Sequence, residues 1–326
     1  MSNPTASDVH VNTPLTNFGQ RYIQTADKFI AMRAMPNLPV SKQSDLYYEF
    51  NRGDFLRDEA EERADNAESA GSGFRLGTDT YFAKVYAFHK DVTDRQRANA
   101  DSQINLDNSA TIWVASKMLI KRETLFNNTY MGASKWTTEV TPAAGDKWDA
   151  STSDPVVQMR VAKRTVQGLT GYIPNKLIIA RDAYDALLDN DAILSRITGG
   201  ATTEVPALVM KQLLTQLFEL DEILIQDAVI NTAKADISDP TAATIAFLST
   251  AQALLYYAPS SLTLDEPTAG AQFSWTGYTG ATPSGFRTSK FRMPASVKTD
   301  RVEAEMAFDQ KITGPDLGYM FLAVLT

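Results

Sequence analysis

The sequence predicts an α+β fold that combines a long helix on an antiparallel sheet, a mixed α/β region and an exposed two-stranded arm. Helix-like and strand-like periodicities both recur along the 326 residues, and 44% of these are hydrophobic, which suits one large domain or two ordinary ones. At about residues 40–94, two strand-like segments flank a segment too polar to bury itself. We therefore expect an arm that is completed by another molecule.

The arm is predicted from this alternation and from its charge. Leu46, Tyr48 and Phe50 share one face of a strand, and a second strand is expected over residues 81–88. Residues 54–68 contain seven acidic residues and two arginines, and we expect a helix there with a thin apolar stripe. The whole stretch 54–94 has ten acidic and five basic residues. Such charge fits either a solvated face or a charge-matched subunit contact.

The N-terminal part is predicted to be an extended tail with a short helix over residues 20–32, ended before Pro36 and Pro39. Thr93 and Gln96 have the spacing of a capping box, and a single helix is expected from there to about Asn127. It would be the longest helix of the chain. Its apolar stripe would consist of Ile112, Ala115, Leu119 and Phe126, with Leu106, Ala110 and Trp113 in an adjoining stripe.

Further elements follow the long helix. Residues 128–153 suit short strands and loops anchored by Trp136 and Trp148. Asp154 followed by Pro155 predicts the start of a helix that continues to about Leu169. The sequence then predicts strands at 175–180 and 222–226, helices at 181–190 and 206–220, strands at 245–248 and 253–257 in the same sheet, and a loop-rich stretch at 259–289 with a strand at 272–275.

The chain ends with a hairpin-like pattern. Hydrophobic residues from Val302 to Phe308 alternate with acidic ones, residues 314–316 have a turn sequence, and 317–325 is apolar on both faces. We expect the two strands to pair, the last strand to be central in a sheet, and the hairpin to pack on the long helix. This arrangement predicts a discontinuous domain wrapped around a continuous one.

Composition excludes several classes of protein. The absence of cysteine excludes disulfides, thiolate zinc sites and cysteine nucleophiles. No apolar run approaches the ~20 residues that cross a bilayer, and the first residues lack the pattern of a signal peptide, so we expect a soluble, non-exported protein. The net charge of −8 and the pI near 4.9 argue against a protein that grips nucleic acid.

The sequence contains no pattern of catalytic or ligand-binding residues. The two histidines, His10 and His89, have no second histidine at helical ligand spacing. Three glycines at residues 71–77 resemble a dinucleotide-binding motif, but their spacing is wrong and no strand precedes them. We therefore predict a protein that is not an enzyme, with no catalytic, cofactor-binding or metal-binding residues and no cofactor.

The basic residues of the long helix form a candidate nucleic-acid surface. Asp101, Asp107 and Glu123 interrupt them, so a solvated or subunit-contacting face is the better interpretation. These basic residues are Arg95, Arg97, Lys117, Lys121 and Arg122.

Three groups of residues occur in an order typical of one protein family. They are Leu38, Pro39 and Val40 followed by residues 42–48 (KQSDLYY), the capped helix with Ser153, Asp154 and Pro155 after it, and residues 171–175 (GYIPN) followed by 177–180 and 184–187. In this order and at these intervals they resemble the major capsid proteins of tailed bacteriophages, which have the Hong Kong 97 capsid fold. The resemblance covers nearly the whole chain.

The resemblance implies a division of the chain. Residues 1–38 would be the N-terminal arm, 39–93 the extended loop that lies over a neighbouring subunit, 94–165 the peripheral domain with its spine helix, 166–289 the axial domain, and 290–326 the return to the peripheral domain as a closing hairpin. Some relatives cross-link subunits through lysine and asparagine side chains. Lys42, Lys84 and Lys90 lie on the predicted arm, and nothing singles one of them out.

The resemblance also implies a function. Copies of the chain would assemble in the host bacterial cytoplasm into hexamers and pentamers of an icosahedral head, and in the virion would enclose double-stranded DNA without sequence-specific binding. Separate scaffolding and portal proteins are expected partners, a decoration protein is a further candidate, and no membrane is involved. The main alternative is the shell of a bacterial nanocompartment, with the same fold and a protein cargo. An enzyme is a candidate of a different class, and a phage tail or adhesin component is a further one.

Overall fold

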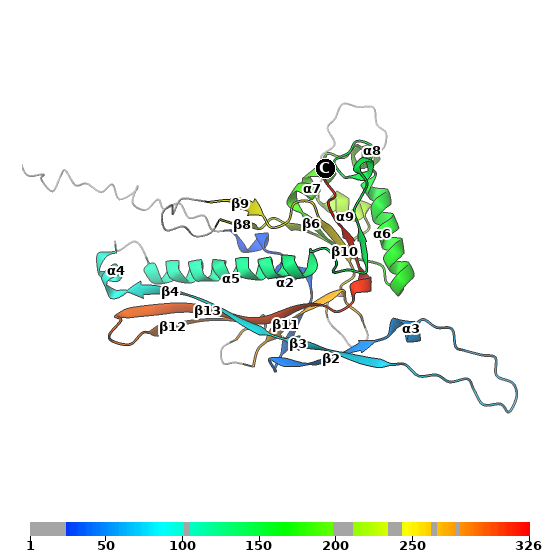
Figure 1. Cartoon of the computed structure of the whole chain (residues 1–326), viewed down its shortest axis with the longest axis horizontal. Coiled ribbons are helices and arrows are strands. Elements are labelled where there is room, and N and C mark those ends of the chain that lie inside the picture. The colour runs from blue at the N-terminus through cyan, green and yellow to red at the C-terminus, as the bar shows by residue number, and fades with distance from the viewer. Residues whose placement is uncertain (1–23, 101–104, 198–210, 234–242, 262–265, 278–280) are drawn as a thin grey trace, which may run out of the picture.

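The structure is a computed structural model that describes residues 24–100, 105–197, 211–233, 243–261, 266–277 and 281–326. Within these residues the strands form two five-stranded sheets and two two-stranded ribbons. A long helix lies along one sheet, the other sheet is covered by shorter helices, and one ribbon extends from the body as an arm (Figure 1). The mixture of helices and mixed sheets confirms the predicted α+β class.

The first sheet, which supports the long helix, draws its strands from distant parts of the chain. In spatial order they are β1 (Asn37–Val40), β11 (Gly270–Trp275), β13 (Thr299–Ile312) and β12 (Phe286–Arg292), while β4 (Lys84–Thr93) pairs with the other edge of β13. The helix α5 (Leu106–Tyr130) packs on it through Val114 and Met118, which contact Met306 and Phe308. Because β13 carries these apolar residues at every second position, they share one face of the sheet, and that face packs against the helix.

The second sheet is covered on both faces. Its order is β5 (Thr138–Val140), β14 (Gly318–Phe321), β10 (Ala253–Tyr256), β6 (Lys176–Ala180) and β7 (Glu222–Gln226). One face packs against α6 (Pro155–Thr170), α7 (Arg181–Leu188), α8 (Asp191–Ile197) and α9 (Lys211–Leu217). The other face packs against the end of α5, through residues such as Phe126 and Tyr130. The two sheets are therefore joined through one helix.

The short N-terminal elements are η1 (Ala26–Lys28) and α2 (Ala31–Ala34), in place of the single helix expected over 20–32, whose first residues lie outside the described part. α2 is fixed by buried polar contacts. The Tyr256 hydroxyl donates to the Ala34 carbonyl at 2.5 Å, and the Ala31 N–H donates to a carboxylate oxygen of Glu123 at 2.9 Å.

The capping box of the long helix is confirmed, but the single helix is not. Thr93 and Gln96 cap a short helix, α4 (Asp94–Asn99), and α5 begins again at Leu106. The predicted stripe was also wrong in part, since Ile112 and Trp113 are exposed while Val114 and Met118 are buried. Sequence periodicity offered adjoining stripes, and the position of the sheet decided which one is buried.

The second strand of the arm differs from the prediction. The expected strand at 81–88 is interrupted at the buried residue Ala83, so that β3 (Leu76–Phe82) pairs with β2 (Ser44–Phe50) whereas β4 joins β13. The predicted helix at 54–68 was wrong as well, because the only helical turn there is α3 (Arg52–Phe55). A helix here would have only a thin alanine stripe and no neighbouring surface to pack on. The free energy gained by burying that stripe is too small to offset the repulsion between the many acidic side chains.

The closing hairpin was also wrong. β13 and β14 are separated by the turn η3 (Pro315–Leu317), belong to different sheets and do not pair with each other. The expected central position of the last strand is confirmed, because β14 lies between β5 and β10. Gly318 allows this placement, since a Cβ there would collide with the ring of Trp136. The pattern fixed strand character but not the partner of each strand.

Other elements agree more closely with the sequence. Asp154 accepts the Val157 N–H and caps α6, and Gly171 ends this helix at φ +82°. Trp136 and Trp148 are buried as expected. The strand predicted at 253–257 lies in the second sheet, whereas β9 (Ile245–Phe247) pairs with β8 (Val229–Asn231) in a separate ribbon, which corrects the placement of 245–248. The 3-10 turn η2 (Ala144–Asp146) precedes Trp148.

Candidate subunit-contact surface

The arm formed by β2 and β3 presents an apolar face that stays largely exposed in the described structure. The two strands pair with each other and with no third strand. Leu46, Tyr48 and Phe50 are 59%, 61% and 45% exposed, and Leu76 and Phe82 on the same face are also exposed. Because a two-stranded ribbon is marginal in water, this face is suited to another surface.

The opposite face of the ribbon is attached to the body at its base. The rings of Tyr47 and Tyr81 pack on Phe273 of β11, at centroid distances of 5.4 and 4.6 Å. Asp79 accepts from Lys311 Nζ at 2.5 Å and from the Tyr47 hydroxyl at 2.7 Å, and these donors lower the pKa of Asp79 to about 2. The arm is thus fixed at its base and open on its outer face.

The far end of the arm has its own small cluster. Phe50, Phe55 and Phe74 pack together with centroid distances of 5.3 to 5.9 Å. Asp54 receives two guanidinium hydrogen bonds from Arg75, both at 3.1 Å, and this contact lowers the pKa of Asp54. Beyond this clasp the chain makes an irregular excursion, and we call residues 58–68 the acidic loop.

The residues considered for chemistry do not form a catalytic or metal site in the described structure. His89 is exposed on β4, and His10 lies outside the described residues. Gly71 and Gly73 stand in open space after the acidic loop, and residues 56–70 directly before them form no strand. In the described part of the chain, no group of three or more histidine, cysteine, aspartate or glutamate residues could hold a metal ion.

The three arm lysines occupy different places. Lys42 pairs with Asp45 at 2.8 Å, which raises the pKa of this lysine. Lys84 and Lys90 lie on β4 and therefore on the first sheet, not on the arm as predicted.

A hollow of about 600 Å³ is lined by residues that include Asn175, Asp221 and Glu266. The Asn175 amide donates to Asp221 at 3.0 Å and to the Ala258 carbonyl at 3.0 Å. These contacts hold a loop in place and do not pair a nucleophile with a base.

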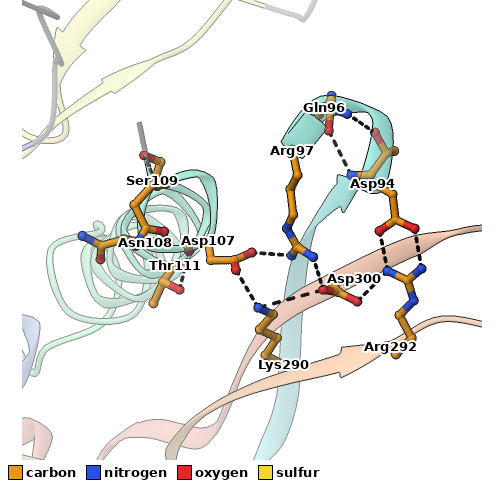
Figure 2. A network of polar contacts seen from close by, with 12 residues as sticks. Asp94, Gln96, Arg97, Asp107, Asn108, Ser109, Thr111, Lys290, Arg292 and Asp300 are labelled. Carbon is orange, nitrogen blue, oxygen red and sulfur yellow. Dashed lines mark hydrogen bonds and ion pairs between the residues drawn. The ribbon is translucent and has the colours of Figure 1, made fainter. Parts of the chain in front are cut away.

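The basic residues of the long helix are not one surface, which corrects part of the sequence interpretation. Arg97 of α4 contacts Asp107 of α5 at 2.6 Å and also contacts Asp300 of β13. Figure 2 shows that Lys290 and Arg292 of β12 complete this network, with Arg292 bound to Asp94 and Asp300. The network ties both helices to the sheet.

Arg122 and Glu123 are buried, a role that their charge did not predict. Arg122 donates to the Gln272 side chain at 3.1 Å and lies 4.8 Å from the ring centroid of Phe308. Burial lowers the pKa of Arg122 to about 10 and raises the pKa of Glu123 to about 7. Their burial could have been predicted from their spacing to Phe126, because a residue one helical turn before a core residue lies on the same face of the helix.

Sequence comparison finds a phage capsid protein as a distant relative. No protein-family model matches the chain. The major capsid protein of Burkholderia phage BcepMu is 22% identical over 235 residues, which are 70% of this chain and 73% of that protein. None of the described helices is long and apolar enough to span a membrane.

Solved structures match over nearly the whole chain. A phage-related protein from Bordetella bronchiseptica RB50 has a TM-score of 0.68 at 17% identity, covering 93% of this chain and 95% of that one. The capsid of cyanophage P-SCSP1u has a TM-score of 0.59 at 8% identity, covering 93% and 89%. An encapsulin from Synechococcus elongatus PCC 7942 has a TM-score of 0.57 at 7% identity, covering 100% and 98%. The predicted resemblance is confirmed: the chain is similar to phage major capsid proteins and has the Hong Kong 97-type capsid fold.

Proposed function

We propose that the chain is a structural major capsid protein and that its copies assemble, as hexamers and pentamers, into an icosahedral phage head around double-stranded DNA. The arm is the observation that carries the proposal. It is fixed at its base by Tyr47, Tyr81 and Asp79, and it exposes an apolar face that a single chain leaves open. The matches to phage capsids support the same conclusion.

The proposed role is structural and not enzymatic, with no cofactor. Assembly would depend on many modest contacts per subunit, since an arm laid over a neighbour buries a large area without one strong site. Separate scaffolding and portal proteins, and a decoration protein as a further candidate, would be its partners. Assembly would take place in the host bacterial cytoplasm, and the product would be the virion capsid.

The charge of the chain fits a container for DNA. A net charge of −8 disfavours tight phosphate binding, which suits a shell whose genome must leave it later. DNA would be enclosed without sequence-specific binding.

The domain division expected from the resemblance also remains a proposal. The N-terminal arm would be residues 1–38, the extended loop 39–93, the peripheral domain 94–165 with the return at 290–326, and the axial domain 166–289. The second sheet would be the centre of the axial domain, and β14 would then contribute to it from the C-terminal return.

The second candidate is the shell of a bacterial nanocompartment that encloses protein cargo. The observation that favours it is the encapsulin match, which covers the whole chain at a TM-score of 0.57. The arm and the acidic composition suit both kinds of shell.

Expression of the full chain, alone and together with candidate scaffolding and portal proteins, tests both candidates. We expect closed particles in negative-stain micrographs, and nuclease-protected DNA in particles from infected cells. Closed particles that hold a specific protein and no DNA would support the nanocompartment. Particles that are helical or trimeric, or a chain that stays monomeric under all these conditions, would contradict the proposal.

A further inference from the structure

A surface shared by β4 and α5, which we call the lysine–aromatic strip, carries positive charge on exposed rings. It consists of Lys84, Tyr86, Phe88 and Lys90 of β4 with Trp113, Lys117 and Lys121 of α5. The β4 residues lie at alternate positions and so share the face that is turned toward α5. The α5 residues are spaced four apart and so share one face of the helix.

The side chains of the strip hold one another in place. Lys90 Nζ and Lys117 Nζ lie 5.5 and 5.8 Å from the ring centroid of Trp113, and Lys121 Nζ lies 5.5 Å from that of Tyr86. Phe88 packs on Trp113 at 5.1 Å, yet these two rings remain 37% and 40% exposed. Because the rings attract the ammonium groups, the charges of the strip are ordered before any ligand binds.

The acidic residues that seemed from the sequence to interrupt this surface are bound elsewhere. Asp107 contacts Arg97 and Lys290, as Figure 2 shows. Glu123 is buried and accepts the N–H of Ala31. The reason for setting aside a nucleic-acid surface on this helix therefore does not hold for Lys117 and Lys121.

The acidic residues of the neighbouring strand face the other way. Glu303 and Glu305 of β13 stand opposite His89 and Ala87 of β4, so they lie on the sheet face that is turned away from the strip. None of the four strip lysines forms an ion pair in the described structure. The strip is thus a local positive surface on a chain whose net charge is −8.

The kind of cation indicates the kind of ligand. All four cations of the strip are lysines and none is an arginine. Lysine is depleted in protein–protein interfaces, where arginine is enriched, because its compact and strongly hydrated charge is costly to bury. The same hydrated charge suits weak contacts with phosphate groups, which release counterions and remain solvated.

The dimensions of the strip fit a stretch of duplex DNA. Lys84 and Lys90 are six residues apart on β4, a distance of about 20 Å. Lys117 and Lys121 are separated by one turn of α5, which adds a second row of charge about 6 Å long. A 20 Å length of duplex presents roughly six phosphates on each strand, which is enough for all four lysines.

The rings are poorly placed to bind a single strand by stacking on its bases. Such binding needs a free aromatic face for each base. The Trp113 ring is already contacted by Lys90, Lys117 and Phe88. The rings therefore support the lysines, and the lysines make the contacts.

We propose that the lysine–aromatic strip binds the phosphate backbone of duplex DNA, and that this face of the subunit is turned toward the interior of the shell. The inference rests on the proposed function, in which the shell encloses DNA. Contacts to phosphates alone are independent of sequence, and the acidic remainder of the chain keeps them weak. Lysines also protect the free edge of a strand such as β4 from unwanted pairing, but that role would not need lysines on α5.

The first test measures DNA binding by the full chain under conditions where light scattering shows that it is unassembled. The probe is a labelled duplex of random sequence, about 20 base pairs long, titrated at several salt concentrations. Lys117→Gln with Lys121→Gln should weaken binding about 100-fold at 50 mM salt. The slope of log K against log salt should change from about −3.6 to about −1.8, since each lysine–phosphate contact contributes about 0.9.

A matched control uses the other exposed basic face, on α6. Arg160→Gln with Arg164→Gln removes two basic residues that form no ion pair in the described chain. We expect this variant to keep the affinity and the salt slope of the wild type. Equal weakening by both pairs would mean that binding follows net charge alone, and it would overturn the proposal.

The second test needs no substitution. Lysines of DNA-filled shells from infected cells are acetylated with a small reagent, and so are the same shells after the DNA has been released and digested. Lys117 and Lys121 should be protected only in the filled shells, whereas Lys211, an exposed lysine of α9, should react equally in both. Protection in both states would assign the strip to a contact between chains. Equal reaction in both states would mean a solvated surface, and either result overturns the proposal.

The outcomes separate this inference from the proposed function. Shells that enclose DNA, formed by a chain whose strip variant binds the duplex as well as the wild type does, overturn the inference and leave the proposed function intact. Closed shells that hold protein and no DNA contradict the proposed function, while the duplex titration still decides whether the strip binds phosphate. Tighter binding of a single strand than of the duplex would mean that the rings stack on bases, which overturns the assignment to duplex DNA.

Discussion

β2 and β10 are both strands with large apolar side chains, yet they have opposite surroundings. In β10 the four residues Ala253–Tyr256 are completely buried between two layers. In β2, Leu46 and Tyr48 are about 60% exposed. The inner face of β2 packs on the body through Tyr47 and Phe273, but its outer face has no second layer, whereas β10 is covered on both faces within its own chain.

The contrast between the two strands shows how the chain divides its tasks. The body contains the two five-stranded sheets, and most of their apolar residues are buried in clusters with the helices packed on them. The arm adds an exposed apolar face, which under the proposed function would be covered in the assembled shell. Changes in the body should thus affect folding, and changes in the arm should affect assembly.

The largest expected effect comes from shortening the arm. Replacing residues 57–73 by a short Gly-Ser linker should abolish closed shells while the subunit stays folded, because the clasp between Asp54 and Arg75 and the base contacts are kept. Micrographs and circular dichroism would measure the two properties. A variant in which the loop keeps its length but has no charged residues would show whether the length of the loop or its charge is needed for assembly. Closed shells of normal size from the shortened chain would show that residues 57–73 are dispensable for assembly.

Single substitutions should divide in the same way. Leu254→Ala, in the covered sheet, should cost about 2–5 kcal/mol of the free energy of unfolding, because it leaves a cavity in a packed core. Tyr48→Ala, on the open face, should change the stability of the unassembled subunit by less than about 0.5 kcal/mol and should reduce shell yield. Urea unfolding at low protein concentration gives the first quantity. Equal destabilisation by both would mean that the arm packs within its own subunit.

Glu123 predicts a pH dependence that belongs to the body. Its pKa is raised to about 7 by burial, so the folded state holds this proton more tightly than the unfolded chain. Stability therefore falls, by linkage, as the pH rises from the unfolded pKa of 4.5 through 7. Glu123→Gln should remove this slope and stabilise the subunit at pH 8 by on the order of 3 kcal/mol. Urea unfolding of the wild type and of the Glu123→Gln variant between pH 5 and 8 measures this pH dependence. The same slope in both proteins would show that Glu123 does not cause it.

The smallest expected effect is at the surface network of Figure 2. Asp300 is bound by Arg97 and Arg292, and these contacts lower the pKa of Asp300. Its stabilising contribution is therefore present at neutral pH and is lost as the pH falls through that lowered pKa. Asp300→Asn should cause a small loss of thermal stability at low salt that vanishes in 1 M salt. A large, salt-independent loss would show that packing and not charge holds α4 on the sheet.

Local signals in the sequence were sufficient for many elements. The box of Thr93 with Gln96, and Asp154 with Pro155, marked two helix starts correctly because capping involves residues only a few positions apart. The exposed arm was also predictable, since the alternation of Leu46, Tyr48 and Phe50 is followed by a segment too acidic to cover them. The resemblance to phage capsid proteins followed from the order of such features.

Tertiary structure decided which partners the elements find. The sequence could not show that Ala83 divides two strands of different sheets, that β14 leaves β13 for the second sheet, or that Arg122 and Glu123 are buried. Strand partners depend on contacts far apart in the chain, and the buried face of α5 depends on the sheet beneath it. The sequence alone therefore determined where many helices and strands begin, and that the strand with Leu46, Tyr48 and Phe50 would have an exposed apolar face. Only the packing of distant segments determined that Arg122 and Glu123 are buried, because their hydrogen-bond partners, Gln272 and Ala31, come from remote parts of the chain.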